Sequence, residues 1–267
     1  AKTITLSATD VEGSSLTYSI VATNNGSVTV SGSTATYTPN ANWNGTDTFT
    51  YKGNDGTADS NTATVTVTVT AVNDAPTTID IATTINENRT ARMAAITLQG
   101  SDVDGNSLTY SVVSDASNGS TSISGATLTY NANQDWNGIE TITYKANDGT
   151  LDSNTATVTV TVAAVNDAPT TIDIATTINE NRTARMAAIT LQGTDIDGDD
   201  LTYSVVSDAS NGSTSISGAS LTYTANSNYN GTETITYKAN DGTVDSNTST
   251  ITITVNAVND VPVAAAV

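Results

Sequence analysis

The hydrophobic and polar residues of this chain alternate over short stretches, with a period of two. The stretch "TATVTVTVTAV" (Thr62–Val72) alternates Val with Thr, so its valines share one face of an extended chain. β-Branched residues fit a pleated, half-buried strand, and the threonine face can contact water. The same alternation of apolar and polar residues occurs in "LTYSVV", "ATLTY" and "ETITYKA". The turn signals "SNG", "WNG" and "NDG" separate these stretches. No window predicts a helix, so the pattern predicts an all-β protein.

The chain repeats itself at long range. The motif "AVNDAP" (Ala71–Pro76) recurs unchanged at Ala164–Pro169 and with one substitution at Ala257–Pro262, a spacing of 93 residues each time. The stretch "TDVEGSSLTYSI" (Thr9–Ile20) has a counterpart in both later copies. These are three copies of one module, and the first lacks about 20 opening residues of the other two.

The number and spacing of the predicted strands indicate the fold of each copy. We count about seven strands per copy, which is typical of an immunoglobulin-like Greek-key sandwich. The Cys–Trp–Cys core of antibody domains is missing. We predict repeat 1 over residues 1–73 with its first strand missing, repeat 2 over 74–166, repeat 3 over 167–260, and the start of a next repeat or a tail over 261–267.

Composition narrows the classes of partner. The chain of 267 residues has 27 acidic and 8 basic residues, a formal charge of −19, which repels nucleic acid and anionic membranes and attracts cations. Without cysteine or histidine, it has no disulfide brace, no imidazole base and no imidazole zinc ligand. No apolar run approaches the ~18 residues of a membrane helix. We therefore expect neither a nucleic-acid partner nor direct membrane insertion.

Acidic residues gather around the repeated motif. In the second copy, Asp102 and Asp104 form D-x-D-G downstream of the linker residue Asp74, and Asp148 lies in "NDG" after another strand. We expect Asp148 at the same pole of the sandwich, beside the D-x-D-G loop. Carboxylates brought together repel each other unless a cation neutralises them. Hard oxygen ligands on an irregular loop suit calcium, which accepts six to eight oxygens in flexible geometry.

The motifs "VNDAP", "SDVDGNSLTYSV" and "YKANDG" together resemble the bacterial cadherin-like tandem repeats of giant surface adhesins, and more distantly cadherin repeats. The resemblance covers the entire chain. It implies seven-stranded sandwiches arranged end to end, with Ca²⁺ bound at each junction. The ligands would come from the linker, from the D-x-D loop and a late Asp of the following unit, and from a Glu of the preceding unit. The first junction, between units one and two, would use Asn73, Asp74, Asp102, Asp104 and Asp148. The second junction, between units two and three, would use Glu87, Asn166, Asp167, Asp195, Asp197 and Asp241.

The sequence departs from the family pattern. Where cadherin linkers begin with Asp, this chain has Ala71 or Ala164, and of the family's internal D-x-E only Asp135 keeps a charge. Fewer anionic ligands imply fewer or weaker ions, with dissociation constants of about 10⁻⁴–10⁻³ M. The first junction also lacks its Glu, because unit one lacks its first strand. We expect the second junction to be the better-formed site. By the same resemblance, six further residues would serve a preceding or a following unit: Asp10, Glu12, Asp55, Glu180, Asn259 and Asp260.

Other readings stay open. Asp and Asn before Gly also form ordinary turns in any β protein. Trp43, Trp136 and Tyr229 occupy one equivalent position, either as a plug over a thin core or as a sugar-stacking platform. The tail Val261–Val267 resembles the start of a strand that a neighbouring molecule could donate to unit one. Paired carboxylates also serve glycoside hydrolysis, but their repetition at every unit end favours a joint over an active site.

We therefore predict a calcium-rigidified extender, or stalk, of a large secreted or cell-surface bacterial adhesin, and not an enzyme. Its expected partners are calcium ions and the neighbouring repeats of the same chain. The alternatives are a carbohydrate-binding adhesion module that uses the loop aromatics, and calcium-dependent self-association. The extracellular location rests on the family resemblance, since the sequence contains no targeting signal.

Overall fold

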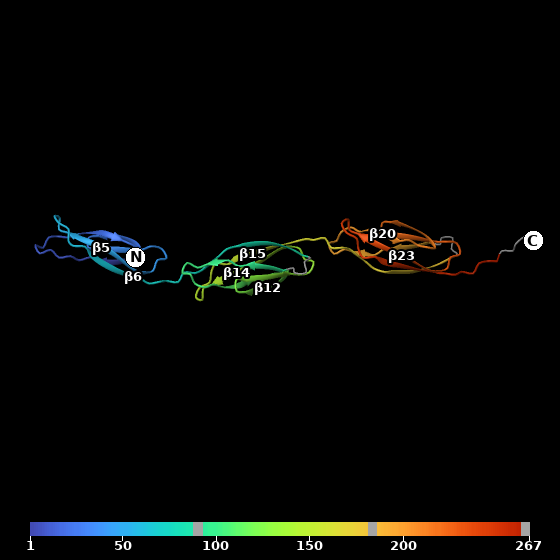
Figure 1. The fold of residues 1–267 in the computed structure, drawn as a ribbon, viewed down its shortest axis with the longest axis horizontal. Helices are drawn as coiled ribbons and strands as arrows, with labels where there is room; N and C mark the ends of the chain where they lie inside the picture. Colours follow the sequence, from blue (N-terminus) through green and yellow to red (C-terminus); the bar gives the residue numbers. More distant parts are fainter. Residues whose placement is uncertain (88–92, 181–185, 263–267) are drawn as a thin grey trace, which may run out of the picture.

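The protein is a row of three β-sandwich units joined end to end (Figure 1). The computed structural model describes residues 1–87, 93–180 and 186–262. All regular elements among the described residues are β-strands. The predicted all-β fold of tandem immunoglobulin-like or cadherin-like sandwiches is confirmed.

The strands follow the predicted alternation of apolar and polar residues. Unit one contains β1 (Lys2–Thr5), β2 (Thr17–Thr23), β3 (Gly26–Ser31), β4 (Thr34–Pro39), β5 (Gly45–Asn54) and β6 (Ala63–Val69). Unit two contains β7 (Thr77–Thr78), β8 (Ile81–Asn86), β9 (Met93–Thr97), β10 (Gly100–Ser101), β11 (Thr109–Ser114), β12 (Gly119–Ser124), β13 (Thr127–Ala132), β14 (Gly138–Asn147) and β15 (Ala156–Ala163). Unit three contains β16 (Thr170–Thr171), β17 (Ile174–Asn179), β18 (Met186–Thr190), β19 (Gly193–Thr194), β20 (Thr202–Ser207), β21 (Gly212–Ser217), β22 (Ser220–Ala225), β23 (Gly231–Asn240) and β24 (Ser249–Asn256).

Units two and three have the same topology. In unit two a four-stranded sheet in the order β11-β14-β15-β8 lies beside a three-stranded sheet in the order β12-β13-β9, and β7 pairs with β10. Strand β8 runs parallel to β15, whereas the other pairs of this unit are antiparallel. Apart from the two-residue pair β7 and β10, seven strands build the sandwich, as the sequence predicts.

The cores are thin and form between the inner faces of the two sheets. In unit two, Val158, Val160 and Val162 are buried and alternate along β15 with the more exposed threonines. Tyr130 and Tyr144 from the facing sheets are fully buried beside them. The period of two in the sequence is therefore a period of burial.

Unit one is open at one edge. Its two sheets have the orders β1-β4-β3 and β2-β5-β6, and no described strand lies beside β6. Val65, Val67 and Val69 are only half-buried, although their counterparts in β15 are buried. The predicted repeat limits at residues 73, 166 and 260 fall between these groups of strands and stay predictions. Within the predicted tail 261–267, residues 263–267 lie outside the described residues.

Candidate functional site at the junctions

At the first junction, hydrogen bonds fasten the linker to two loops of unit two. The Asn73 side-chain amide donates to Asp148 Oδ2 (2.7 Å), and Asn73 Oδ1 accepts from the Asn106 side chain (2.8 Å). The backbone N–H of Asp74 donates to Asp104 Oδ2 (2.8 Å). The structure therefore brings together Asn73, Asp74, Asp104 and Asp148, the linker and loop residues that the sequence analysis groups.

The D-x-D-G loop shields one oxygen of the Asp102 carboxylate from solvent. Asp102 Oδ1 accepts from the backbone N–H groups of Asp104 (2.9 Å) and Asn106 (3.1 Å). Gly105, with φ of +80°, supplies the left-handed residue that turns the loop. The other oxygen, Asp102 Oδ2, is buried and has no hydrogen-bond partner within the described structure. A buried carboxylate oxygen without a partner is unfavourable, and it is free to accept a cation.

Asp148 is held in its charged form. Its Oδ1 accepts from the backbone N–H groups of Thr150 (2.6 Å) and Leu151 (2.7 Å). The Leu151 N–H and the Asn73 side chain together lower the pKa of Asp148 to about 2, because hydrogen bonds to the ionised form favour it. The carboxylate is therefore negative at neutral pH.

The second junction repeats this arrangement. Asn166 donates its side-chain amide to Asp241 Oδ2 (2.8 Å), and the Asp167 N–H donates to Asp197 Oδ2 (2.7 Å). The Asp197 N–H donates to Asp195 Oδ1 (2.9 Å), and Asp195 Oδ2 is again buried without a hydrogen-bond partner. The five predicted residues of the linker and following unit therefore gather at this junction too.

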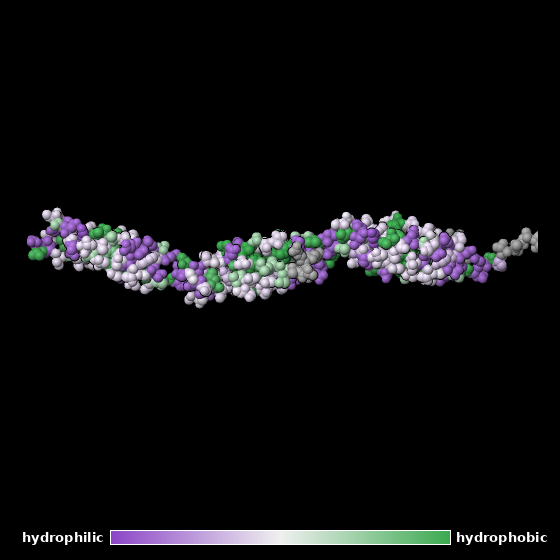
Figure 2. Space-filling model, viewed as in Figure 1, coloured by the Kyte–Doolittle hydropathy of each residue, from purple (hydrophilic) through white to green (hydrophobic). Residues whose placement is uncertain are grey.

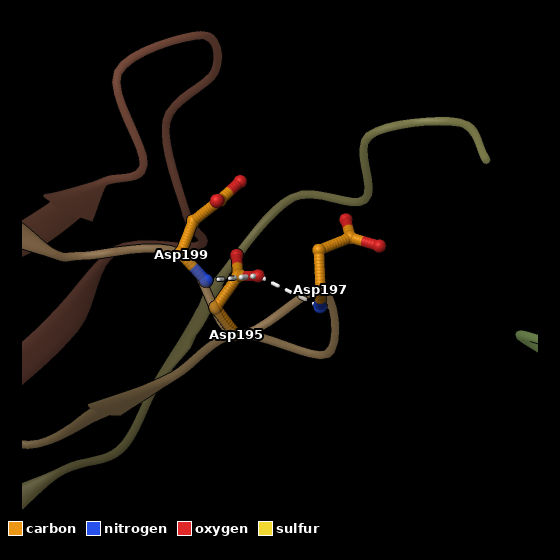
Figure 3. A group of neighbouring side chains, drawn as sticks. All are labelled: Asp195, Asp197 and Asp199. Carbon is orange, nitrogen blue, oxygen red and sulfur yellow. Dashed lines mark hydrogen bonds between the residues drawn. The ribbon is translucent and has the colours of Figure 1, made fainter.

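A further carboxylate, Asp199, belongs to the second junction. The ligand oxygens of Asp195, Asp197 and Asp199 all lie within 4.8 Å of one another, and Figure 3 shows the Asp195 carboxylate between the other two side chains. The Asp199 N–H donates to Asp195 Oδ1 (3.3 Å). The sequence analysis missed Asp199, whose signal is the third acid in "DIDGD"; unit two has Asn106 at this position.

Asp135 of unit two, the unit that precedes the second junction, lines the same cleft as Asp195. A cleft of about 460 Å³ is lined by Gln134 and Asp135 of unit two and by Asp167 and Asp195 beyond the linker. The sequence analysis noted the charge of Asp135 without assigning it as a ligand. At the first junction, the corresponding cleft of about 270 Å³ contains the neutral Asn42. Hydrophilic residues gather where one unit meets the next (Figure 2).

Glu87 is tied to the start of the second linker. It is buried, its Oε1 accepts from the Val165 N–H (2.7 Å), and its Oε2 accepts from the Asn137 side chain (3.0 Å). The parallel pairing of β8 with β15 brings it there. In unit three, Glu180 makes the same bonds to Val258 (2.8 Å) and Asn230 (3.1 Å). Glu87 is thus hydrogen-bonded to the linker backbone, and within the described part of the chain no hydrogen bond joins it to the aspartate loops.

The aromatic residues before Asn-Gly pack onto the protein itself. Trp136 and Tyr229 are partly buried against the cores of units two and three. The Tyr229 hydroxyl donates to the Thr232 carbonyl (3.0 Å), and a Cβ on Gly138 would lie 3.0 Å from the Trp136 ring. This packing agrees with a plug over the core, and no contact among the described residues supports a sugar platform.

Comparison with known proteins identifies the family. Residues 1–68, 73–161 and 166–254 each match the sequence model described as a bacterial Ig domain. The chain belongs to the bacterial Ig domain family. Integrin beta-like protein A of Dictyostelium discoideum is 31% identical over 218 residues, which cover 66% of this chain and 11% of that protein. The chain therefore spans a small part of its curated relative.

Solved structures resemble this bacterial Ig-domain chain in fold. The human CDH23 EC21-23 fragment is 20% identical with a TM-score of 0.63, over 91% of this chain and 89% of that one. Protocadherin Gamma B2 extracellular cadherin domains 1–5 are 15% identical with a TM-score of 0.60, over 92% of this chain and 54% of that one. The predicted cadherin-like tandem repeat is confirmed at the level of the fold, and its VNDAP/DxDG subtype stays a prediction. Among the described residues there is no helix with the length and apolar character to cross a membrane.

Proposed function

We propose that this chain is an extender segment of a large secreted or cell-surface bacterial adhesin, stiffened by calcium at its junctions. One observation carries the proposal. At each junction the linker is hydrogen-bonded to an acidic loop of the following unit, and that loop contains a buried carboxylate oxygen without a partner, on Asp102 or Asp195. A divalent cation satisfies such an oxygen and neutralises the surrounding carboxylates.

The residues present fit calcium. At the second junction Asp195, Asp197 and Asp199 offer oxygens within 4.8 Å of one another, and Asp135 lines the same cleft. Asp241 accepts from Asn166 and the Val244 N–H, which lower its pKa and keep it charged. Calcium prefers oxygen ligands of this type in flexible arrangements. The first junction has neutral residues in place of Asp135 and Asp199, so we propose that it binds calcium more weakly.

A bound ion links the parts that would otherwise move. The D-x-D-G loop belongs to the following unit, Asp167 to the linker and Asp135 to the preceding unit, so one ion contacting all three restricts the hinge. By mass action, calcium also stabilises the folded chain by about 0.4–1.4 kcal/mol per site at one to ten times its dissociation constant. The chain contains no cysteine, and metal would take the place of disulfides as the brace.

The same arrangement argues against catalysis. The acidic clusters recur at the unit ends in the role of linker acceptors, and the chain contains no histidine to serve as a general base. We propose that the partners are calcium and the neighbouring repeats, that the chain is not an enzyme, and that it works outside the cell as a spacer for a terminal binding domain.

Small-angle scattering of the full chain, with calcium and with a chelator, tests this function. We expect a longer, stiffer particle in millimolar calcium. The double variant Asp195→Ala and Asp197→Ala should lose the response at the second junction. Asp200→Asn is the matched control, because it removes a charge from the same loop outside the three-aspartate group. A double variant that responds to calcium as the parent does would overturn the ligand assignment, and an unresponsive parent would overturn the function.

A further inference from the structure

In units two and three, the strands next to the entry and the exit of the chain lie side by side and run in the same direction. In unit two, β8 is parallel to β15 with six paired residues, from Val158↔Ile81 to Ala163↔Asn86. In unit three, β17 pairs with β24 in the same way. The chain enters each unit shortly before the first of these strands and leaves it after the second. Tension along the chain therefore pulls the two strands in opposite directions.

This pull acts along the strands. The strands lie roughly along the row of units (Figure 1), and both members of each parallel pair run from the entry pole to the exit pole. The ladder hydrogen bonds join neighbouring strands, across the direction of pull. Tension thus loads all the bonds of the ladder together, in shear, whereas a force across the strands would break them one after another.

Side-chain hydrogen bonds join the same two segments at the entry pole of unit two. The Asn154 side chain accepts from the Thr78 N–H (2.9 Å) and donates to the Thr78 carbonyl (2.9 Å), and the Thr78 hydroxyl donates to the Asn154 carbonyl (2.7 Å). Asp80 Oδ1 accepts from the Thr157 N–H (2.7 Å). These bonds connect the segment that leads into β8 with the segment that begins β15, which are the two pieces that tension separates.

Glu87 joins the two segments at the exit pole. Its backbone N–H donates to the Ala163 carbonyl (3.1 Å), and its Oε1 accepts from the Val165 N–H (2.7 Å). The ladder of unit two is therefore closed by side-chain bonds at both ends. Unit three has the equivalent bonds, at 2.7 to 3.0 Å, between Asn247 and Thr171, Asp173 and Thr250, and Glu180 and Val258.

The parallel ladder is where tension concentrates. Strand β8 lies at the edge of its sheet and pairs with β15 alone, whereas β15 also pairs with β14 over seven residues, from Gly138↔Val162 to Tyr144↔Ala156. The short strand β7 adds two pairs with β10. The shorter ladder and the side-chain bonds at its two ends therefore decide when the unit opens.

We propose that this ladder and its side-chain bonds form a mechanical clamp, which keeps each unit folded when the chain is under tension. In unit two the clamp consists of β8, β15 and the bonds of Asp80, Glu87 and Asn154. Its role goes beyond the stiffening of the junctions, because the clamp acts within one unit and without calcium. Calcium at a junction would restrict how two units are oriented, and the clamp sets the force at which a unit opens.

Single-molecule force spectroscopy of the full chain in a chelator tests the clamp. The chain contains no cysteine, so handles can be attached at Ala75→Cys and Ala168→Cys, two exposed linker positions on either side of unit two. Tension then passes through unit two alone. We expect Asp80→Ala and Asn154→Ala each to raise the unfolding rate at a fixed force by about tenfold, because each variant lacks hydrogen bonds that must break before the unit opens.

A second direction of pull uses the same bonds in another geometry. Handles at Ala75→Cys and at the exposed Thr155→Cys lie at the entry pole, so force pulls β8 and β15 apart from one end. Unit two should then open at a several-fold lower force than in the first direction, because the bonds break in sequence. Equal opening forces in the two directions would overturn the proposal.

Asp115→Ala is the matched control variant. Asp115 lies between β11 and β12, outside the clamp, and accepts from the Thr121 hydroxyl and the Ala116 N–H. This variant should be less stable in urea and yet unfold under tension at the parental rate. Equal acceleration by all three variants would show general destabilisation, and parental rates in both clamp variants would show that these bonds bear no load; either result refutes the clamp. Because the chelator removes calcium throughout, neither result bears on the calcium proposal, which the scattering experiment tests.

Discussion

The side chain of Asn73 spans the first junction to Asp148, 75 residues later in the chain, with a 2.7 Å hydrogen bond. Asn73 also accepts from Asn106 (2.8 Å), so one linker amide connects two loops of unit two. Asn166 donates to Asp241 in the same way (2.8 Å). The linker is therefore hydrogen-bonded to the loops of the following unit, and we expect the junction to bend at the few residues before it.

We expect Asn73→Ala to loosen the first junction even in a chelator, because Asp148 and Asn106 both lose their linker partner. Distance distributions between spin labels on units one and two should broaden. Asn259→Ala is the matched control: Asn259 has the same motif position, but within the described residues its side chain donates only to the Asp260 carbonyl (3.4 Å). Equal distributions in parent and Asn73→Ala would show that the bond does not restrain the hinge.

Within the D-x-D-G loops, the two junctions differ in charge at Asn106 and Asp199, and exchanging these residues should bring the two calcium affinities closer together. We expect Asp199→Asn to weaken calcium binding at the second junction by about tenfold, since ligand charge count tunes calcium sites. Asn106→Asp should strengthen the first junction. Isothermal titration calorimetry of both variants measures this. Unchanged affinity in both would remove Asp199 from the ligand set.

The fold could be predicted from the sequence because the signals that define its strands and turns are local. Alternation of Val and Thr in Thr62–Val72, and Asn-Asp-Gly turns at fixed spacing, define strands without knowledge of their partners. The grouping of the linker residues with the D-x-D-G residues could also be predicted, because the 93-residue repeat shows that they recur as a set.

Two features of the site depend on contacts that no local pattern reports. Asp135 lies at the far end of its own unit and joins the cleft only when unit three stacks against it. Glu87 reaches Val165 through the parallel pairing of β8 with β15, a contact between residues 78 positions apart. The motif "INEN" shows that Glu87 is acidic, but it does not indicate which hydrogen bonds Glu87 accepts.

A comparison of Glu87 with Glu180 separates the effect of this glutamate on folding stability from its effect on calcium binding. Each accepts two hydrogen bonds at the end of its unit, so Glu87→Gln and Glu180→Gln should each lower the free energy of unfolding by about 1 kcal/mol in a chelator. Among the described residues, Glu87 is followed by a unit with an acidic loop, Asp195–Asp199, and Glu180 is not. We therefore expect only Glu87→Gln to reduce the further stabilisation by calcium, measured by urea unfolding. Identical calcium responses would restrict Glu87 to its structural role.

Stability should fall in alkali through buried tyrosines, including one in the three-stranded sheet of each unit. Burial, together with the neighbouring Asp47, Glu140 or Glu233, raises the pKa of Tyr37, Tyr130 and Tyr223 to about 12. The unfolded tyrosines lose their protons near pH 10. Below pH 10 both states are neutral and the full stability is present. Between pH 10 and 12 the unfolded state releases protons first, so stability is lost as pH rises.

Urea midpoints recorded from pH 9 to 12, beside tyrosinate absorbance of the folded chain, measure this effect. Tyr130→Phe should start from a lower midpoint at pH 9, because the hydroxyl no longer donates to the Asn118 carbonyl (2.9 Å). The midpoint of unit two should then fall less steeply with pH than in the parent, since one late-titrating group is gone, although Tyr144, whose pKa burial also raises, remains. Parallel slopes for parent and variant would mean that Tyr130 titrates alike in both states, and that some other group drives the alkaline loss.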